Sequence, residues 1–317
     1  MSFALNQRAF ILTEELTRRL REWRIEKHLL PGGGCVFDFG VEAEGSLAAG
    51  LALARICMSG LGEVSVAPGE VGSVAWPHVM VTIDEPVAAC LLSQYAGWQV
   101  SVGDFFGMGS GPMRAAAATE ELFAKLGYSE TADRAVGVLE TSKLPGEAVF
   151  AYIAEKTGIH AASNVLLAAR TASLAGTVQI VARSVETALH KLHELGFDVG
   201  RIRSAYGTAP LAPVAADDLA AIGRTNDAIL YGGRVTLWVR GDDDSLAEIG
   251  PRVPAASSPA YGKPFAEIFR EAGGDFYKID PLLFSPAEVT LQNLDTGRVH
   301  RFGQPAPDVL QKSFGIE

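Results

Sequence analysis

Two side chains of opposite charge, Arg183 and Glu186, stand three residues apart in a stretch whose pattern is typical of a helix. At this spacing they are neighbours on a helix surface. One interpretation is a surface ion pair, which stabilises a helix by about 0.3 kcal/mol. The other is a carboxylate that a guanidinium keeps ionised, ready to accept a proton from water as a general base. The spacing alone does not distinguish these alternatives.

The helix that positions this pair is predicted to start after Gly176 and to end at Gly196. One face is apolar and carries Val178, Val181, Val185, Ala188 and Leu192. About 100° around the axis lies a polar stripe, made of Gln179, Arg183, Glu186, His190 and His193. The chain on either side of the helix is mostly small and apolar. We therefore expect the stripe to face the protein interior, as a satisfied network or as a working site.

A metal site is a second use for the polar stripe. His190 and His193, with Glu186 before them, have the spacing of metal ligands. Catalytic zinc usually takes three protein ligands, however, and no second pair is formed by His28, His78, His160 and His300. We predict no metal. The chain also lacks the Gly-x-Ser-x-Gly elbow of a serine hydrolase and a convincing nicotinamide fingerprint.

A glycine-rich loop, Phe105–Pro112, leads from a predicted strand into a helix predicted over Met113–Leu126. Backbone N–H groups in such a loop can bind an anion. The loop lacks the Gly-Lys-Ser/Thr of a phosphate-binding Walker motif. A tight packing turn is the alternative, and it is the commoner role for loop glycines.

Composition restricts the class of protein. The chain has 317 residues and 48% hydrophobic content, which suits a globular fold of one large or two ordinary domains. A formal charge of −10 argues against nucleic acid as a partner. We find no signal-peptide core and no apolar run that approaches a membrane span. The three scattered cysteines indicate reduced residues of a cytoplasmic protein.

Strands and helices follow one another in irregular order, so we predict an α+β fold rather than a Rossmann sheet or a barrel. No low-complexity linker divides the chain, so we expect two closely interleaved subdomains, roughly 1–160 and 161–317. A stiff turn is predicted over Gly207–Pro213. Two strands, Ala228–Tyr231 and Arg234–Arg240, are predicted around a Gly-Gly turn.

Several segments together resemble the methenyltetrahydromethanopterin cyclohydrolases. They read SGPMRA (110–115), SLAGTVQIVARSVET (173–187), GRTND (223–227), LYGGR (230–234) and DFYKIDPLLFSPA (275–287). The resemblance runs from the first predicted helix nearly to the C-terminus. Departures are single residues, Met113 and Tyr95, and they affect details of substrate contact rather than the chemistry.

The resemblance implies an α+β chain of two intertwined subdomains, usually a homotrimer, with the pterin in the cleft between them. The implied activity is reversible hydrolysis of the 5,10-methenyl cation to the 5-formyl compound in one-carbon metabolism, without metal or prosthetic group. The family's catalytic arginine and glutamate fall on Arg183 and Glu186. A non-catalytic pterin-binding carrier or assembly subunit is the alternative. The sequence leaves open the pterin tail and the physiological direction, including formaldehyde oxidation.

Substrate contacts are expected from two groups of residues. The aromatic loop with Phe276, Tyr277 and Phe284 can pack on the pterin or aryl ring, or be ordinary core. Acidic parts of the substrate tail are expected near Lys278 and the loop glycines. The predicted substrate-binding set is Ser93, Gln94, Gly109, Ser110, Gly111, Lys278 and Phe284.

Overall fold

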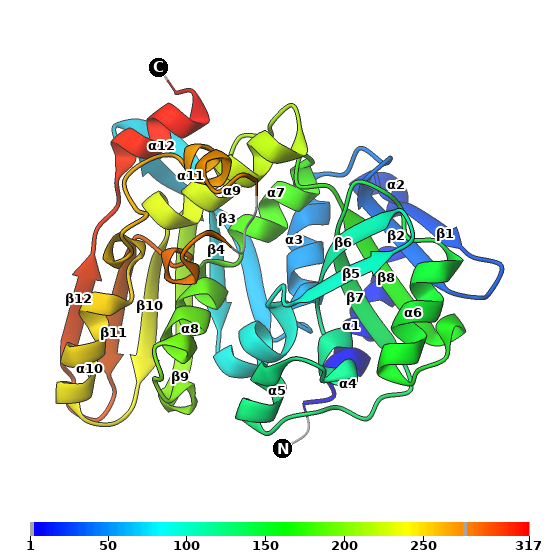
Figure 1. The fold of residues 1–317 in the computed structure, drawn as a ribbon, viewed down its shortest axis with the longest axis horizontal. Coiled ribbons are helices and arrows are strands. Elements are labelled where there is room, and N and C mark those ends of the chain that lie inside the picture. The colour runs from blue at the N-terminus through cyan, green and yellow to red at the C-terminus, as the bar shows by residue number, and fades with distance from the viewer. Residues whose placement is uncertain (1–2, 275–277, 317) are drawn as a thin grey trace. The chain divides into compact units, whose positions relative to one another are not determined.

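The computed structural model describes residues 3–274 and 278–316 and divides into two compact units. The first comprises Met1–Gly62 and Ala88–Gln179, and the second Glu63–Val87 and Ile180–Glu317. The chain therefore passes from one unit to the other after residues 62, 87 and 179. These boundaries differ from the expected division near residue 160, because the segment 63–87 belongs with the C-terminal part of the chain. Both units combine helices with a mixed sheet, which confirms the α+β class (Figure 1).

A six-stranded mixed sheet organises the first unit, in the order β1-β2-β8-β7-β6-β5. The strands are β1 (Glu26–Leu29), β2 (Cys35–Gly40), β8 (Asn164–Ala169), β7 (Ala135–Glu140), β6 (Phe105–Ser110) and β5 (Trp98–Val102). The central strands β2, β8 and β7 are parallel, and the outer strands pair antiparallel. Every residue of β8 is buried, as expected for a central strand covered on both faces.

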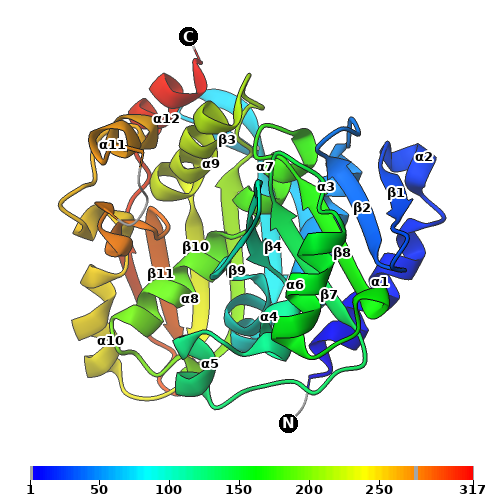
Figure 2. The same ribbon diagram turned by 45° about the vertical axis from the view of Figure 1, so that its right-hand side comes forward.

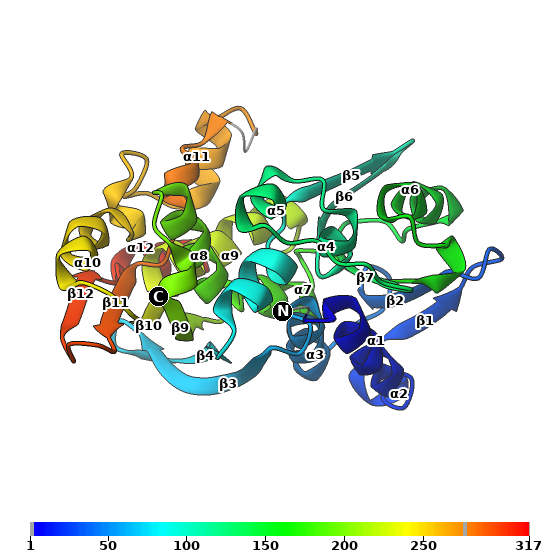
Figure 3. The same cartoon turned by 90° about the horizontal axis from the view of Figure 1, so that it is seen from below.

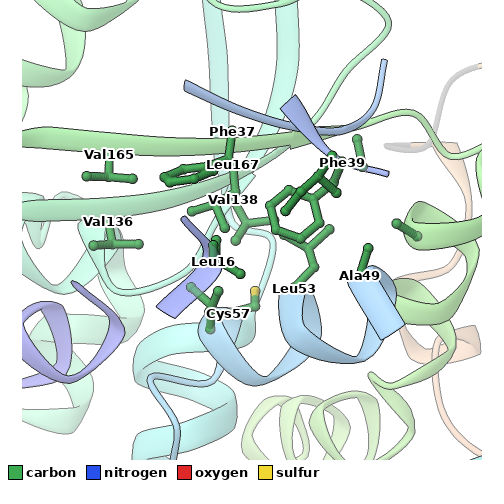
Figure 4. Packing of buried hydrophobic residues seen from close by; sticks show 14 of the residues in the cluster. Leu16, Phe37, Phe39, Ala49, Leu53, Cys57, Val136, Val138, Val165 and Leu167 are labelled. Atoms are coloured by element: carbon green, nitrogen blue, oxygen red, sulfur yellow. The ribbon is translucent and has the colours of Figure 1, made fainter. Parts of the chain in front are cut away.

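Helices cover both faces of this sheet. On one face α1 (Leu5–Leu16) and α3 (Leu47–Cys57) pack on alternate residues of the strands, and Figure 4 shows Leu16 and Leu53 of these helices in one cluster with Phe37, Phe39 and Val138. On the other face lies α6 (Glu147–Thr157), with Phe150 and Ile153 among the buried side chains. The alternation of a strand's side chains between two faces produces these two separate clusters.

The second unit is built on another six-stranded mixed sheet, in the order β12-β11-β10-β9-β4-β3. The strands are β12 (Val299–Gly303), β11 (Glu288–Asn293), β10 (Arg234–Val239), β9 (Ile202–Pro210), β4 (Val74–Ile83) and β3 (Gly62–Val71). β10 and β11 pair in parallel, whereas β9 pairs antiparallel with both β10 and β4. Figures 2 and 3 show α8 (Ser184–Glu194) lying along this sheet beside β9 and β10.

The remaining helices are α2 (Leu20–Trp23), the π-helix η1 (Val87–Gln94), α4 (Met113–Ala117), α5 (Glu121–Leu126), α7 (Leu174–Val181), α9 (Asp218–Gly232), α10 (Asp243–Ile249), α11 (Phe265–Glu271) and α12 (Pro307–Phe314). Of these, α9 has 15 residues and packs on β9, α11 and α12. Short 3₁₀ turns are η2 (Ala161–Ser163), η3 (Val199–Arg201), η4 (Gly250–Arg252), η5 (Ala255–Ser257) and η7 (Pro281–Leu283). Within the described ranges, no helix is long and apolar enough to cross a membrane.

Two predicted helices are each interrupted. The helix expected after Gly176 is divided into α7 and α8 by a turn at Ala182 and Arg183. The helix expected over Met113–Leu126 is divided into α4 and α5, because Ala118 adopts a left-handed conformation with φ 43°. Neither break coincides with proline or glycine, so the sequence pattern gave no stop signal.

Two further predictions in the second unit are wrong. The stiff turn expected over Gly207–Pro213 is largely strand, since β9 continues to Pro210 and pairs with β4 as far as that residue. The strand expected over Ala228–Tyr231 is the last turn of α9. All four of its side chains are buried, so an apolar run that is short and covered all round looks the same in a helix and in a strand.

Candidate functional site

The start of α8 carries the two residues predicted to be catalytic. Arg183 is the N-cap residue, with φ −88° and ψ 8°, in the bridge region of backbone conformation where many active-site residues lie. Its N–H donates to Ile180 O at 3.0 Å, and its carbonyl accepts from Thr187 N at 2.9 Å. These bonds close the last turn of α7 and open the first turn of α8. Glu186 lies in that first turn, so the two residues keep the predicted spacing despite the break.

Both side chains are buried, with Arg183 7% and Glu186 4% exposed. Gln179, a turn before them, is 2% exposed. The prediction that this polar stripe faces the interior is therefore confirmed for its first three members. Exposed pairs contribute little, whereas buried charges persist only with partners, so the interpretation as an ordinary surface ion pair does not hold.

The apolar face of α8 packs into the protein and so sets the position of Arg183 and Glu186. Val185, Ala188 and Leu192 are completely buried, as the period of the sequence predicts. Gly207 of β9 provides the seat for the first turn. A Cβ on Gly207 would lie 2.6 Å from Ser184 Oγ and 2.8 Å from Val185 Cγ2. Only a residue without a side chain permits this approach of helix to strand.

The helix terminus favours a negative charge at Glu186. The first turn of a helix presents unpaired N–H groups and the positive end of the helix dipole. A carboxylate there is stabilised by about 0.3–1 kcal/mol, and more where it is partly buried. The arrangement therefore supports an ionised Glu186 that accepts a proton.

In the first unit, Ser93 and Gln94 end the π-helix η1, and both are fully buried. Single π-helical turns often occur at functional sites. The Ser93 hydroxyl donates to Cys57 O at 2.7 Å and lies 2.7 Å from Ser59 Oγ. Ser110, 2% exposed, lies with its hydroxyl 3.3 Å from Val138 O and 3.4 Å from Cys57 Sγ. Both hydroxyls thus take part in hydrogen bonds within this unit.

The predicted glycine loop is mostly strand, because β6 runs from Phe105 to Ser110, and the end of this strand is held at the same place. The N–H of Gly111 donates to Ser93 O at 2.8 Å, so this donor is used inside the protein and not offered to an anion. Gly111 has φ +85°, which explains the need for glycine. A Cβ on Gly109 would lie 2.9 Å from both Met113 Cε and Trp98 O. This geometry favours the packing-turn interpretation for Gly109 and Gly111.

A buried arginine that the sequence did not single out fastens this cluster. Arg114 has a fully buried side chain and donates to both carboxylate oxygens of Glu120, at 2.7 and 2.6 Å. A third nitrogen, Nη1, lies 3.2 Å from Leu91 O and 3.3 Å from Ser93 O. The guanidinium therefore caps the C-terminal carbonyls of η1 and sets where Ser93 stands.

The loop expected to bind the substrate ring is described only in part, since Phe276 and Tyr277 lie outside the described residues. Lys278 is exposed. Phe284 is half-buried, and its ring meets the fully buried Phe265 ring at 5.6 Å and 58°. Substrate binding by Lys278 and Phe284 remains a prediction.

The structure thus gathers the predicted residues in two groups. In the first unit, Ser93, Ser110 and Gly111 are joined by the contacts above, and Gln94 O lies 3.9 Å from the same Cys57 Sγ. Gly109 precedes Ser110 on β6. In the second unit, Arg183 and Glu186 start α8, while Lys278 and Phe284 belong to the loop that follows α11.

Two buried ionisable residues of the second unit were missed. Lys191 lies on α8 and is 1% exposed. Asp227 on α9 is fully buried and accepts from Phe265 N at 2.8 Å and Ser313 Oγ at 2.5 Å. Burial raises the pKa of the Asp227 carboxyl to about 7. A signal existed for Lys191, which stands one turn after Ala188 on the apolar side of the helix.

Among the described residues, no group of three or more histidine, cysteine, aspartate or glutamate side chains could hold a metal. His190 Nε2 lies 3.8 Å from Glu194, one turn along α8.

Comparison with known proteins gives matches over nearly the whole chain. A family model described as "Cyclohydrolase (MCH)" matches residues 4–314. The methenyltetrahydromethanopterin cyclohydrolase of Rhodopirellula baltica is 50% identical over 289 residues, which cover 90% of this chain and 87% of the relative. That of Methylobacillus flagellatus is 43% identical over 98% of this chain and 95% of its own. That of Methanococcoides burtonii is 39% identical over 99% of each chain.

Proposed function

Because this chain belongs to the cyclohydrolase (MCH) family, we propose that it catalyses the reversible hydrolysis of 5,10-methenyltetrahydromethanopterin to the 5-formyl compound. The observation that carries the proposal is the buried pair at the start of α8, Arg183 and Glu186, within the matched residues 4–314. The substrate is the one named for the relatives.

The substrate brings its own electrophile. The methenyl carbon lies between two nitrogens that share a positive charge, so water can attack it without a Lewis acid. Glu186 orients the water and accepts one of its protons as the carbon–oxygen bond forms. The product of this step is a neutral tetrahedral adduct, and the positive charge on the two nitrogens is lost.

The adduct then opens. Glu186, now protonated, delivers the proton to the aryl nitrogen, and the bond between this nitrogen and the carbon breaks as the carbonyl forms. The hydroxyl proton leaves to solvent. One water is thus consumed and one proton released, and the same steps in reverse describe cyclisation.

Arg183 keeps Glu186 ionised and limits its rotamers in this scheme. Its guanidinium can also donate to the oxygen that develops on the adduct. A guanidinium beside a carboxylate makes that carboxylate a weaker base, while burial opposes this effect. The balance of the two sets the pH at which the enzyme works.

The remaining features of the proposal follow from the family resemblance. We infer an enzyme of one-carbon metabolism that uses no metal or prosthetic group, acts in the cytoplasm and assembles as a homo-oligomer, a trimer in the usual case. Ser93, Gln94, Gly109–Gly111, Lys278 and Phe284 stay the proposed substrate-binding residues.

The test follows the near-ultraviolet absorbance of the methenyl compound after addition of purified protein, with and without a chelator. The variant Glu186→Gln should bind the substrate and turn over about 10² to 10⁴ times more slowly, because it lacks the base. Glu194→Gln, on the same helix with a side chain 45% exposed, is the matched control and should retain activity. A Glu186→Gln enzyme within about tenfold of wild type would exclude the general-base role.

A wild-type protein that binds the compound without consuming it would point instead to the non-catalytic carrier or assembly subunit. Titration of the protein into the methenyl compound, with bound and free substrate separated by ultrafiltration, distinguishes this outcome from a protein that does not bind.

A further inference from the structure

A buried ammonium group lies on the helix that carries the catalytic pair. Lys191 follows Glu186 by five residues on α8 and is 1% exposed. Its Nζ donates to Leu282 O, to Ser257 Oγ at 2.9 Å and to Pro254 O at 3.5 Å. An ammonium has three N–H donors, and these three acceptors match that number. A buried lysine is costly, so its retention here requires an explanation.

The acceptors belong to two segments that are already bound to each other. Ala255 N donates to Pro286 O at 3.0 Å, and Ser258 Oγ donates to Asp280 at 2.5 Å. Asp280 also caps the short helix η7 by accepting from Leu282 N at 3.0 Å. Residues 254–258 and 280–286 are therefore hydrogen-bonded to each other, and Lys191 connects both segments to α8.

The hydrogen bond from Lys191 to Leu282 O sets the position of Phe284. Phe284 follows η7 by one residue and lies two positions after the carbonyl that Lys191 binds. Its ring is supported from another direction by Phe265, whose N–H is held by Asp227. The backbone near Phe284 is thus held by Lys191 of α8, and the Phe284 ring packs on Phe265, which is held by Asp227 of α9. All of these contacts lie within the second unit.

We propose that Lys191 is a positioning residue for this enzyme, holding the 280–286 loop on the same helix as Glu186 so that Phe284 meets the substrate ring at a set place. The inference rests on the proposed function for the role of Phe284. It assigns Lys191 no contact with substrate. We call the hydrogen bonds from Lys191 to residues 254, 257 and 282 the clamp. Loss of the clamp should therefore weaken substrate binding more than it slows the chemical step.

The electrostatics of the site agree with a clamp of limited strength. Burial lowers the pKa of Lys191 to about 8, with Asp280 opposing this effect and Arg252 adding to it. Two of the acceptors are main-chain carbonyls, and the third is the Ser257 hydroxyl, which itself donates a hydrogen bond to Arg252 O at 2.8 Å. The loop is thus held through its backbone, by a group that can lose its proton in mildly alkaline solution.

The test compares Lys191→Met, which keeps length and loses the charge, with Asn293→Ala as a matched control. Asn293 is 2% exposed in the same unit, and its Nδ2 donates to Gly241 O and Asp243 Oδ1, both at 2.8 Å. Steady-state kinetics with the methenyl compound should give a KM about tenfold higher for Lys191→Met and a kcat within about threefold of wild type. The control should lose thermal stability without a change in KM.

Amide hydrogen exchange gives a readout that does not depend on activity. In Lys191→Met the exchange of residues 280–286 should rise at least about fivefold while that of β9 is unchanged. Exchange that rises equally throughout the unit, or a KM equal to wild type, overturns the proposal. If Lys191→Met does not fold, Ser257→Ala removes one acceptor at an exposed residue and should raise the KM about two- to threefold. An unchanged KM in that variant overturns the proposal equally.

The two proposals fail in different ways. If the wild-type protein does not consume the methenyl compound, the proposed function fails, and the exchange experiment still decides whether Lys191 holds the loop. If the wild type is active and neither KM nor exchange responds to the substitution, only the clamp is refuted.

Discussion

Replacing Gly207 by alanine tests whether the seat of α8 on β9 controls catalysis. The new Cβ would lie 2.6 Å from Ser184 Oγ and 2.8 Å from Val185 Cγ2. Ordinary van der Waals contact begins near 3.4 Å, so the first turn of α8 must retreat by about 0.8 Å. Arg183 caps this turn and Glu186 lies in it, so both must move with it. A misplacement approaching 1 Å can cost about 10²-fold in rate, so we expect kcat to fall by about 10- to 100-fold.

Overpacking also destabilises the fold, by about 1–3 kcal/mol, so the assay needs a control that separates this effect from catalysis. Gly232→Ala provides it. A Cβ there would lie 2.6 Å from Pro210 Cδ, an equally close approach in the same unit that does not involve α8. Both variants should unfold at lower urea concentrations than wild type. Only Gly207→Ala should show a lower kcat in the absorbance assay.

A second substitution tests the cause directly. Ser184→Ala removes the atom nearest to the new methyl group, and the Ser184 hydroxyl has no hydrogen-bond partner among the described residues. The double variant Ser184→Ala/Gly207→Ala should therefore recover part of the lost kcat, which a double-mutant cycle measures. A Gly207→Ala enzyme with wild-type kcat, or a Gly232→Ala enzyme with the same kcat loss, would refute the reasoning.

Two predictions concern stability. Because the pKa of Asp227 is raised to about 7 from an ordinary 3.8, the folded state holds this proton more tightly than the unfolded state. The contribution is complete below about pH 4 and is lost as the pH rises through 7, at no more than about 1.4 kcal/mol per pH unit. Urea unfolding of Asp227→Asn should show a flatter dependence between pH 5 and 8, and equal slopes would contradict the assignment. Arg114→Met leaves Glu120 without its bidentate partner and should cost about 3–5 kcal/mol in the same measurement. A loss below about 1 kcal/mol would show that the pair is not needed for stability.

Elements with local signals could be predicted from the sequence. The sequence pattern predicts a helix over Glu147–Thr157 and a strand over Ala135–Glu140, and the structure has α6 and β7 with these bounds. Gly146 and Gly158 stand at the two ends of the helix, and Gly158 adopts the left-handed conformation, φ +72°, that commonly ends one. Where the information lies within a few residues, pattern and structure agree.

Elements determined by distant contacts could not be predicted in this way. The last turn of α9 is apolar on every side because β9, α11 and α12 surround the helix, and this environment removes the period that reveals a helix. Likewise, β9 runs past Gly207 because β4 pairs with it there, although the glycine and the prolines that follow are typical of a turn. Tertiary pairing overrode the local preference in both cases.

The residues of the candidate site likewise differ in whether local sequence or distant contacts determine their arrangement. The spacing of Arg183 and Glu186 predicts that the two are neighbours at the start of a helix, and the structure keeps that spacing. Their catalytic role is an expectation from the family resemblance and not from the spacing. The roles of Arg114 and Lys191 depend on carbonyl groups 23 and 91 residues away in the chain. A sequence pattern shows only that these basic residues stand among apolar neighbours.

The place of β8 in its sheet has a consequence for how the protein is made. β8 lies between β2 and β7, yet it is the last of these three strands in chain order. During synthesis the ribosome must therefore release about 170 residues before the centre of that sheet can close. In the other sheet, β4 can pair with β9 only after a still longer part of the chain has been made. Nascent chains arrested before this point carry open strand edges, and pairings over such sequence distances form slowly. Until β8 is available, each of these open edges is a place where another chain can pair with the growing protein.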